Sequence, residues 1–233
     1  MMLIPKSICV ALVSVVLTGL AGCEGLEGAR IRDQNSPTVS VRATFRPEVL
    51  SRGRSEGGIE VGYERYRAND TQQLGAGQHV DVGTQHISGP DSLHNQVTVQ
   101  QGHLAYAQRI SFGSHFRLEP RLGVSRMGTD LTVEPTVSTQ RAQSQRWGTR
   151  FFYGITPSWR FNDVLALEAR VTGSNGGAMR TYAFDAGLLV SPVPGASLRL
   201  GYSERRHTGY VPDSLSELDI RVRGPSASLV FDF

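Results

Sequence analysis

Apolar and polar residues alternate along most of this chain with a period of two, the spacing typical of β-strands, and almost no segment has the period of a helix. The pattern predicts an all-β protein. Its segments are about 9 to 16 residues long, which exceeds the five or six residues of an average strand and suits a tilted strand that crosses a membrane. The expected strands are Thr38–Arg46, Gly58–Arg67, Gln78–Ile87, Gln96–Phe112, His115–Met127, Trp147–Phe161, Val164–Gly173, Arg180–Ser191, Ala196–Arg205 and Asp219–Phe233.

The two faces of these strands differ in bulk as well as in polarity. One face is aliphatic and aromatic, while the other combines charged residues with Gly and Ala. The apolar face is too bulky to fill a small barrel, whereas Gly and Ala leave room for long Arg side chains. We therefore expect a closed antiparallel transmembrane β-barrel with its apolar face outside and an ion-paired charge network inside. The expected interior charges are Glu60, Glu64, Arg109, Arg117, Glu119, Arg121, Arg160, Glu168, Arg170, Asp185, Arg199, Arg221, Arg223 and Asp232.

The number of strands follows less directly from the pattern. Ten strands use every alternating segment and place both ends of the barrel on the side of the short turns, which we expect to be periplasmic. An eight-stranded barrel from Gly58 keeps the same parity, with a long first loop over residues 68–95 and Thr38–Arg46 as an extension. In the last segment Ile220 and Val222 break the parity of the apolar face, and a bulge near Gly224 and Pro225 would restore it.

The N-terminal segment has the features of a secretory signal. Lys6 precedes an apolar run from Ile8 to Leu17 that is too short to span a membrane. The following Leu-Ala-Gly-Cys, residues 20–23, resembles the lipobox of bacterial lipoproteins. The resemblance implies a signal peptide over residues 1–22 and a lipid on Cys23. Together with the alternating segments, it predicts a periplasmic linker over 23–37 and a barrel over 38–233. Glu24 after the Cys favours delivery to the outer membrane.

The C-terminal residues resemble the β-signal that the barrel-insertion machinery reads in bacterial outer-membrane proteins. The matching positions are Ala227, Leu229, Phe231 and the terminal Phe233. In architecture the chain resembles the small outer-membrane barrels of the OmpX, OmpA-barrel and opacity-protein group. This resemblance implies contact with outer-membrane lipids and lipopolysaccharide, but it does not carry one function, because members of that group differ in activity.

Charge and chemistry narrow the function only in part. The formal net charge is +3, or +2 without Lys6, and no basic cluster indicates nucleic-acid binding. No Ser-His-acid pattern, cofactor motif or metal-ligand spacing stands out. The residues considered for catalysis or for a metal were Asn69, His79, His86, Asp91, His94, His103, His115, Ser203, His207, Thr208 and Asp213.

We therefore expect a non-enzymatic surface-interaction or envelope-structural role that the loops carry out. The alternatives are an outer-membrane enzyme, either lipid A-modifying or an omptin-like protease, and a narrow channel. A wide pore is not expected, because side chains just fill the interior of an eight-stranded barrel.

Overall fold

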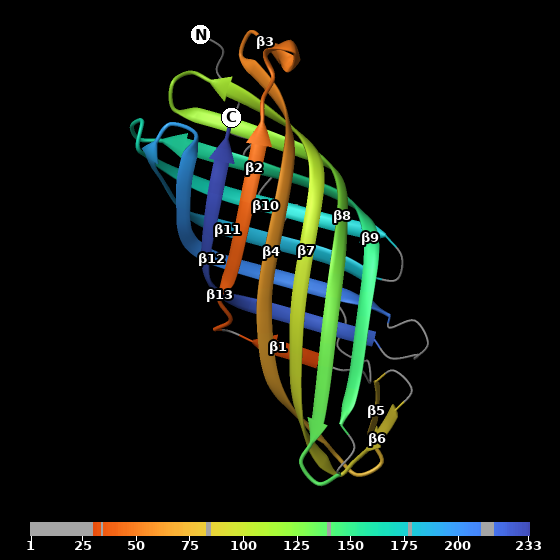
Figure 1. The fold of residues 1–233 in the computed structure, drawn as a ribbon. Helices are drawn as coiled ribbons and strands as arrows, with labels where there is room; N and C mark the ends of the chain where they lie inside the picture. Colours follow the sequence, from red (N-terminus) through yellow and green to blue (C-terminus); the bar gives the residue numbers. More distant parts are fainter. Residues whose placement is uncertain (1–29, 34, 83–84, 139–140, 177–178, 211–216) are drawn as a thin grey trace, which may run out of the picture.

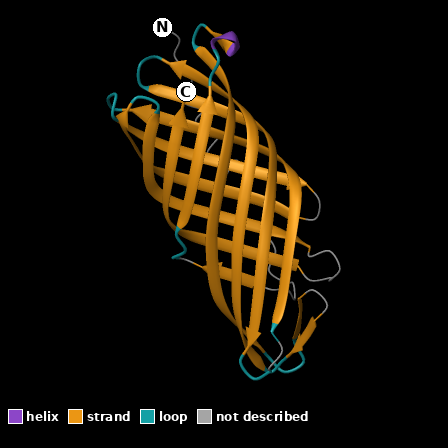
Figure 2. Cartoon of the chain, in the orientation of Figure 1, coloured by secondary structure: helices purple, strands orange, loops and turns teal. Residues whose placement is uncertain are grey.

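The chain folds into one closed, barrel-shaped sheet (Figures 1 and 2). This is a computed structural model, and it describes residues 30–233 except 34, 83–84, 139–140, 177–178 and 211–216. Nine strands pair around a ring in the order β2, β4, β7, β8, β9, β10, β11, β12, β13 and back to β2. Their bounds are β2 Thr38–Phe45, β4 Ser55–Leu74, β7 Asp91–Phe112, β8 Phe116–Pro135, β9 Ala142–Arg160, β10 Leu165–Gly176, β11 Met179–Val193, β12 Ala196–Tyr210 and β13 Glu217–Asp232.

A few short elements complete the fold. Strand β1, Arg30–Asp33, pairs with β13, and β3, Ser51–Arg52, pairs with β4 after the single 3-10 turn Glu48–Leu50. Strands β5, His79–Val82, and β6, Gln85–Ser88, form a separate hairpin. No helix among the described residues is long and apolar enough to cross a membrane.

The ring closes through a parallel pair of strands, and this corrects the expected count of ten. Strand β2 pairs with β13 from Thr38–Ser226 to Thr44–Asp232, and all other neighbouring pairs in the ring are antiparallel. Because β2 runs in the same direction as β13, the first strand of the ring enters from the side opposite the short turns. The expectation that both ends of the barrel lie beside the short turns is therefore wrong for the first strand.

The expected third strand, Gln78–Ile87, lies outside the ring. Its residues form the β5–β6 hairpin in the connection between β4 and β7, at the far end of the barrel from the C-terminus (Figure 1). The apolar side chains of Val80, Val82 and Ile87 are 2–3% exposed and join the buried apolar cluster of that end. The eight-stranded alternative placed this segment outside the barrel, as the structure does. The ten-stranded alternative placed Thr38–Arg46 in the barrel, and β2 does belong to the ring.

Several strands are longer than the sequence pattern predicts. Strand β8 continues to Pro135 and β9 begins at Ala142, so much of the expected loop over residues 128–146 is sheet. Here the inward-facing residues are apolar, as at Met127, Leu131 and Val133, whereas in the rest of the barrel the apolar residues face outward. The short turns at 113–115, 161–164 and 194–195 all lie beside the C-terminal end of the ring (Figure 1).

Strand β13 contains no bulge near Gly224 and Pro225. Its register with β12 runs without a shift from Phe231 to Glu217. Ile220 and Val222 therefore point inward, where they are 0% and 2% exposed, and their neighbours Arg221 and Arg223 point outward. The expected parity change is wrong because the interior of this end of the ring is itself apolar.

Candidate functional site

The outer surface of the ring is apolar on the half that lies next to the short turns. We call this surface the apolar belt and this part of the ring the belt half. On β8 the belt covers nine residues, from Phe116 to Val124, which is the length of a membrane-spanning strand. Exposed members around the ring include Val39, Val41, Ile59, Val61, Tyr63, Leu104, Tyr106, Leu122, Val124, Phe151, Leu167, Phe184, Leu188, Leu198, Leu200, Tyr202 and Leu229.

Aromatic residues mark both edges of the belt. Trp159, Phe161 and Phe233 lie at the short turns and are 50%, 54% and 68% exposed, while Tyr63 and Tyr202 lie at the opposite edge. Phe231 stacks on Phe233 with the ring centroids 6.2 Å apart. The expected assembly residues Leu229, Phe231 and Phe233 thus belong to this outward surface. Whether they guide insertion stays a prediction.

The interior of the belt half is charged, as the sequence predicts, and its centre is Glu60 on β4. Glu60 is 0% exposed. Its carboxylate accepts hydrogen bonds from Arg121 Nε at 2.8 Å and from His103 Nε2 at 2.9 Å, and Arg42 Nε lies 3.7 Å away. Gly62 leaves room for the His103 ring, because a Cβ at this position would clash with that ring. Full burial of a carboxylate requires such pairing.

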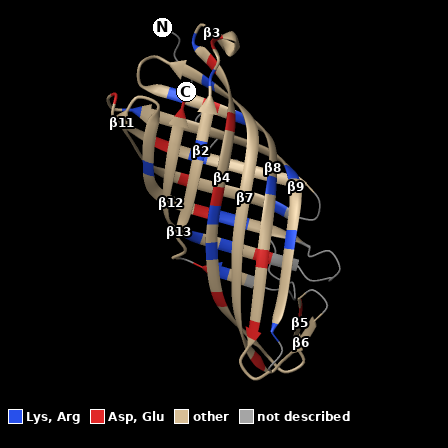
Figure 3. Ribbon diagram, in the orientation of Figure 1, with Lys and Arg blue, Asp and Glu red and all other residues tan. Residues whose placement is uncertain are grey.

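Two further groups of ion pairs extend the network along the barrel. Toward the short turns, Glu119 pairs with Arg46, Arg109 and Arg121, and Asp232 pairs with Arg46 at 2.7 Å and with Arg109. Toward the other end, Asp185 pairs with Arg199 at 3.4 Å and with Arg205 at 3.1 Å. The charged residues are thus spread along the strands rather than confined to the turns (Figure 3).

Some of these pairs cross the interior of the ring. Arg42 on β2 lies 3.3 Å from Glu168 on β10, which stands on the opposite side of the ring. Arg205 on β12 lies 2.9 Å from Glu64 on β4. Side chains from different walls therefore meet inside the ring, both within the belt half and at its border with the loop half, which opposes a wide pore.

The expected interior set is largely placed inside, with two corrections. Arg221 and Arg223 point outward and pair with Glu204 at 2.9 and 3.0 Å. Sequence reasoning also missed Arg42, Arg46 and Arg205. These three follow the same alternation as the expected interior residues, so strict use of parity on Thr38–Arg46 and Ala196–Arg205 would have found them.

Arg170 is a buried interior residue without a direct partner. It is 7% exposed, and among the described residues no hydrogen bond or ion pair reaches its guanidinium, whose Nε is buried without an acceptor. Arg117 also has no ion pair within the described part of the chain, and Arg160 pairs with the exposed Asp163 at 3.1 Å. Among the described residues, some interior arginines thus have no carboxylate partner.

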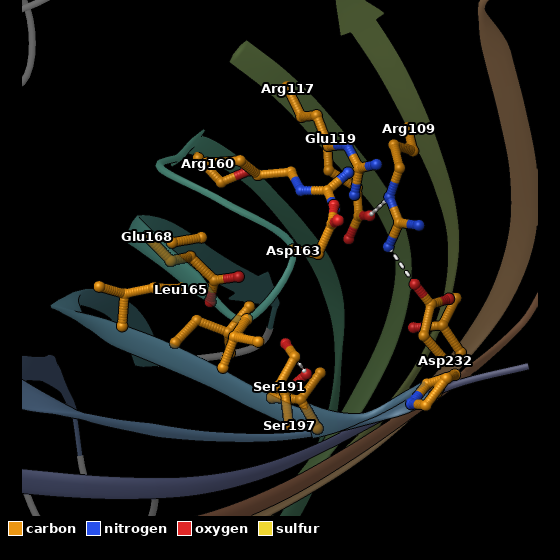
Figure 4. Close-up of a pocket in the computed structure, with 18 of the residues that line it drawn as sticks. Arg109, Arg117, Glu119, Arg160, Asp163, Leu165, Glu168, Ser191, Ser197 and Asp232 are labelled. Atoms are coloured by element: carbon orange, nitrogen blue, oxygen red, sulfur yellow. Dashed lines mark hydrogen bonds and ion pairs between the residues drawn. The ribbon is translucent and has the colours of Figure 1, made fainter. Parts of the chain in front are cut away.

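A cavity of about 560 Å³ opens between the strands at the short-turn end. Arg117 and Arg160 reach into it from one side, and Arg109 lies between Glu119 and Asp232 (Figure 4). Ser191 and Ser197 line the other side and share a hydrogen bond of 2.7 Å. The lining acids pair with Arg, so none of them is a free carboxylate of the kind that acid-base catalysis needs.

Beyond the belt, polarity inverts, and we call this part of the ring the loop half. Its interior is mainly apolar, although Asn95 and His207 are also buried there. The apolar core is formed by Ile31, Tyr66, Ala68, Leu74, Val80, Val82, Ile87, Leu93, Val97, Val99, Met127, Leu131, Val133, Ala142, Ile220 and Val222. Its outer face is polar. On β4 the outward positions change from Ile59, Val61 and Tyr63 to Arg65 and Arg67, all five exposed.

Exposed arginines follow the edge of the belt that borders the loop half. Arg65 and Arg67 on β4, Arg126 on β8 and Arg180 on β11 point outward there, and we call these four residues the arginine collar. Arg126 lies over the Trp147 ring, 5.6 Å from its centroid. Arg65 and Arg67 have no acidic partner in the described regions. The collar therefore presents positive charge directly beside an apolar surface.

The histidines considered for catalysis make structural contacts instead. His207, in the loop half beyond Tyr202, is fully buried, contacts Tyr66 Oη and lies 2.8 Å from Thr181 Oγ1. Burial lowers the pKa of His207 to about 4, against the attraction of Glu64. Ser203 Oγ bonds to Thr38 Oγ1 at 3.2 Å, so Ser203 and His207 form no catalytic pair.

The remaining candidates divide between structural roles and one cluster. Asp91 accepts backbone N–H bonds from Ser92, Thr136 and Val137 and thereby holds the β8–β9 connection. His115 bonds to the carbonyl of Arg160 and stacks on Trp159. Of the three histidines near the first long connection, the structure brings His79 and His86 together with Asp81, and His94 stands apart. Cys23 and Asp213 lie outside the described residues.

Comparison with protein-family models, with curated proteins and with solved structures found no match to this chain.

Proposed function

We propose that the chain is a membrane-spanning β-barrel whose belt half lies in lipid and whose loop half projects into water. The observation that carries this proposal is the inversion of both faces at one level of the ring. On the side of the short turns the outside is apolar and the inside charged, and on the other side the outside is polar and the inside mainly apolar. Soluble monomers rarely expose a contiguous apolar patch above a few hundred Å². Lipid would remove the belt from water.

The barrel would span the bacterial outer membrane, with its short turns in the periplasm. Short periplasmic turns and longer outer connections are typical of such barrels. The lipobox-like residues up to Cys23 and the apolar C-terminus support export and insertion into that membrane. The nine-stranded ring departs from the even strand numbers of bacterial single-chain barrels, so the likeness to the OmpX and OmpA-barrel group is one of architecture.

The arginine collar supports lipopolysaccharide and other anionic lipids as partners. Arg65, Arg67, Arg126 and Arg180 stand where the acyl region would meet the headgroups. Guanidinium groups bind phosphate in a bidentate manner and keep their charge at any physiological pH. Lipid phosphates would therefore pair with the collar while acyl chains cover the adjacent belt.

Within this membrane the protein would have a structural or surface-interaction role rather than a catalytic one. Among the residues considered for catalysis, His207, Ser203 and Asp91 make structural contacts. Ion pairs across the ring, such as Arg42 with Glu168, leave little room for solute flux through the belt half. The polar outer face and the connections of the loop half remain the surface that a partner would meet.

The test is a membrane fractionation of wild type beside Cys23→Ala, with gel migration before and after boiling and with intact mass. We expect heat-modifiable protein in the outer membrane and a triacyl mass that is absent from the variant. Protein in the soluble periplasmic fraction, with equal migration in both lanes, would overturn the barrel proposal. An outer-membrane barrel without the acyl mass would remove only the lipid on Cys23.

Two further measurements address the alternatives. The mass profile of lipid A from expressing and deleted cells should be the same, and a difference would restore the lipid A-modifying enzyme. A planar-bilayer recording should lack discrete conductance steps, and their presence would restore the channel.

A further inference from the structure

The β5–β6 hairpin has two chemically distinct faces. Its apolar face, formed by Val80, Val82 and Ile87, is almost fully buried on the core of the loop half. The opposite face is exposed to water and carries His79, Asp81 and His86. Because the buried face fixes the backbone of both strands, the exposed side chains stand on a supported element instead of a free loop.

The register of the hairpin brings the three exposed side chains together. Asp81 stands directly opposite His86, and His79 stands opposite Ser88, two residues along from His86. His86 Nδ1 lies 2.6 Å from Asp81 Oδ1, and the rings of His79 and His86 are 4.7 Å apart between centroids. One ligand atom from each of the three residues lies within 4.8 Å of the other two.

We infer that this face of the hairpin binds one divalent transition metal ion, with Zn²⁺ as the best fit. Two imidazoles and one carboxylate are a ligand set that zinc uses when a water completes its tetrahedron. Imidazole ligands disfavour Ca²⁺ and Mg²⁺, which take oxygen donors. The site is open to solvent, so an ion can reach it without any movement of the barrel.

A bound ion would connect the two strands of the hairpin. His79 and Asp81 lie on β5 and His86 lies on β6, so the ligands come from both sides of the turn. The ion would hold the hairpin closed above the apolar core that Val80, Val82 and Ile87 help to form. This inference does not depend on the membrane proposal, because the site lies on the loop half, away from the belt.

The test is zinc binding by the mature chain from residue 23, folded in detergent without a polyhistidine tag and with Cys23→Ala to remove the free thiol. Competition with a chromogenic zinc chelator gives affinity and stoichiometry. We expect one Zn²⁺ per chain. His86→Ala should weaken binding by about 100-fold or more, since loss of an outer-shell partner alone costs 10- to 100-fold.

Matched variants separate this site from other zinc-binding groups. His94→Ala removes an exposed His on the neighbouring strand β7, and Ser88→Ala alters the same hairpin face without removing a ligand. Both should bind zinc as wild type does. Asp81→Asn should bind zinc more weakly with an unchanged far-ultraviolet circular dichroism spectrum, which shows that the fold persists. No zinc uptake by wild type, or equal affinities of wild type and His86→Ala, would overturn the inference.

Discussion

Replacing Leu122 on β8 by Arg tests whether the apolar belt lies in lipid. Leu122 is 55% exposed and stands between Tyr106 and Tyr153 on the outer face. Arg126, the first charged residue on that face, is four residues away, or about 13 Å along the strand. A strand tilt of about 40° reduces this to about 10 Å of depth, near the middle of an apolar band about 25 Å tall.

At that depth an outward Arg costs about 2–4 kcal/mol in a membrane-spanning barrel. This corresponds to a fall of about 30- to 700-fold in the folding equilibrium constant, at about 1.4 kcal/mol per factor of ten. On a water-exposed face the same substitution would change the free energy of unfolding by about 0.5 kcal/mol or less. The two environments therefore predict results that differ by more than the error of a stability measurement.

The assay is reversible guanidinium unfolding in phosphatidylcholine vesicles, followed by the fluorescence of Trp147 and Trp159. Gln143→Arg on β9 is the control, because Gln143 is exposed on the outer face of the loop half. We expect its free energy of unfolding to match that of wild type. A Leu122→Arg protein as stable as Gln143→Arg would refute the placement of the belt in lipid.

Three further predictions concern the ring and its interior. Cysteines at Val39 and Ala227, which are register partners in the parallel pair, should form a disulfide in the folded protein, whereas failure to cross-link under oxidation would contradict the nine-stranded closure. Glu60→Gln should lower the free energy of unfolding by about 3–5 kcal/mol, because it leaves buried arginines without a counter-charge. Glu56→Gln at the exposed rim should lower it by under about 1 kcal/mol. Equal losses in the two variants would contradict the buried network. His207 has a pKa near 6.5 in the unfolded chain and about 4 in the folded chain. Its contribution to the free energy of unfolding is therefore complete above about pH 7, and that free energy should fall by about 3 kcal/mol as the pH drops toward 4. A His207→Gln variant should lack this pH dependence, and equal slopes in the two proteins would refute its origin in His207.

Alternation predicted the belt half well because one physical rule governs it throughout. Each strand there presents apolar residues outward and charged or small residues inward, so parity alone places Glu60, Glu119 and Arg121 inside. The loop half follows the opposite rule. The expectation of an apolar outer face holds only in the belt half. It therefore ended the predicted strand at Met127, where β8 in fact continues, and predicted a bulge near Gly224, where β13 has none.

Other features depend on contacts that a linear pattern does not contain. The closing pair of β2 with β13 joins residues from the two ends of the chain. The cluster of His79, Asp81 and His86 depends on the register of one hairpin, and their spacing along the sequence matches no ligand motif. The ion pairs of Glu204 with Arg221 and Arg223 depend on the outward position of these side chains, which the register of β12 with β13 sets.

The parallel closure has a consequence for the side of the membrane on which a lipid on Cys23 would lie. Arg30 pairs with Asp219 in the loop half, six residues beyond Pro225 at the belt edge. The seven residues from Cys23 to Arg30 reach about 25 Å at most. With the short turns in the periplasm, the acyl chains would enter the leaflet that faces the medium, and not the periplasmic leaflet that a periplasmic linker over residues 23–37 would require. Secretion would then have to deliver the acylated end across the bilayer together with the loops, and an epitope placed after Cys23 should bind antibody on intact cells.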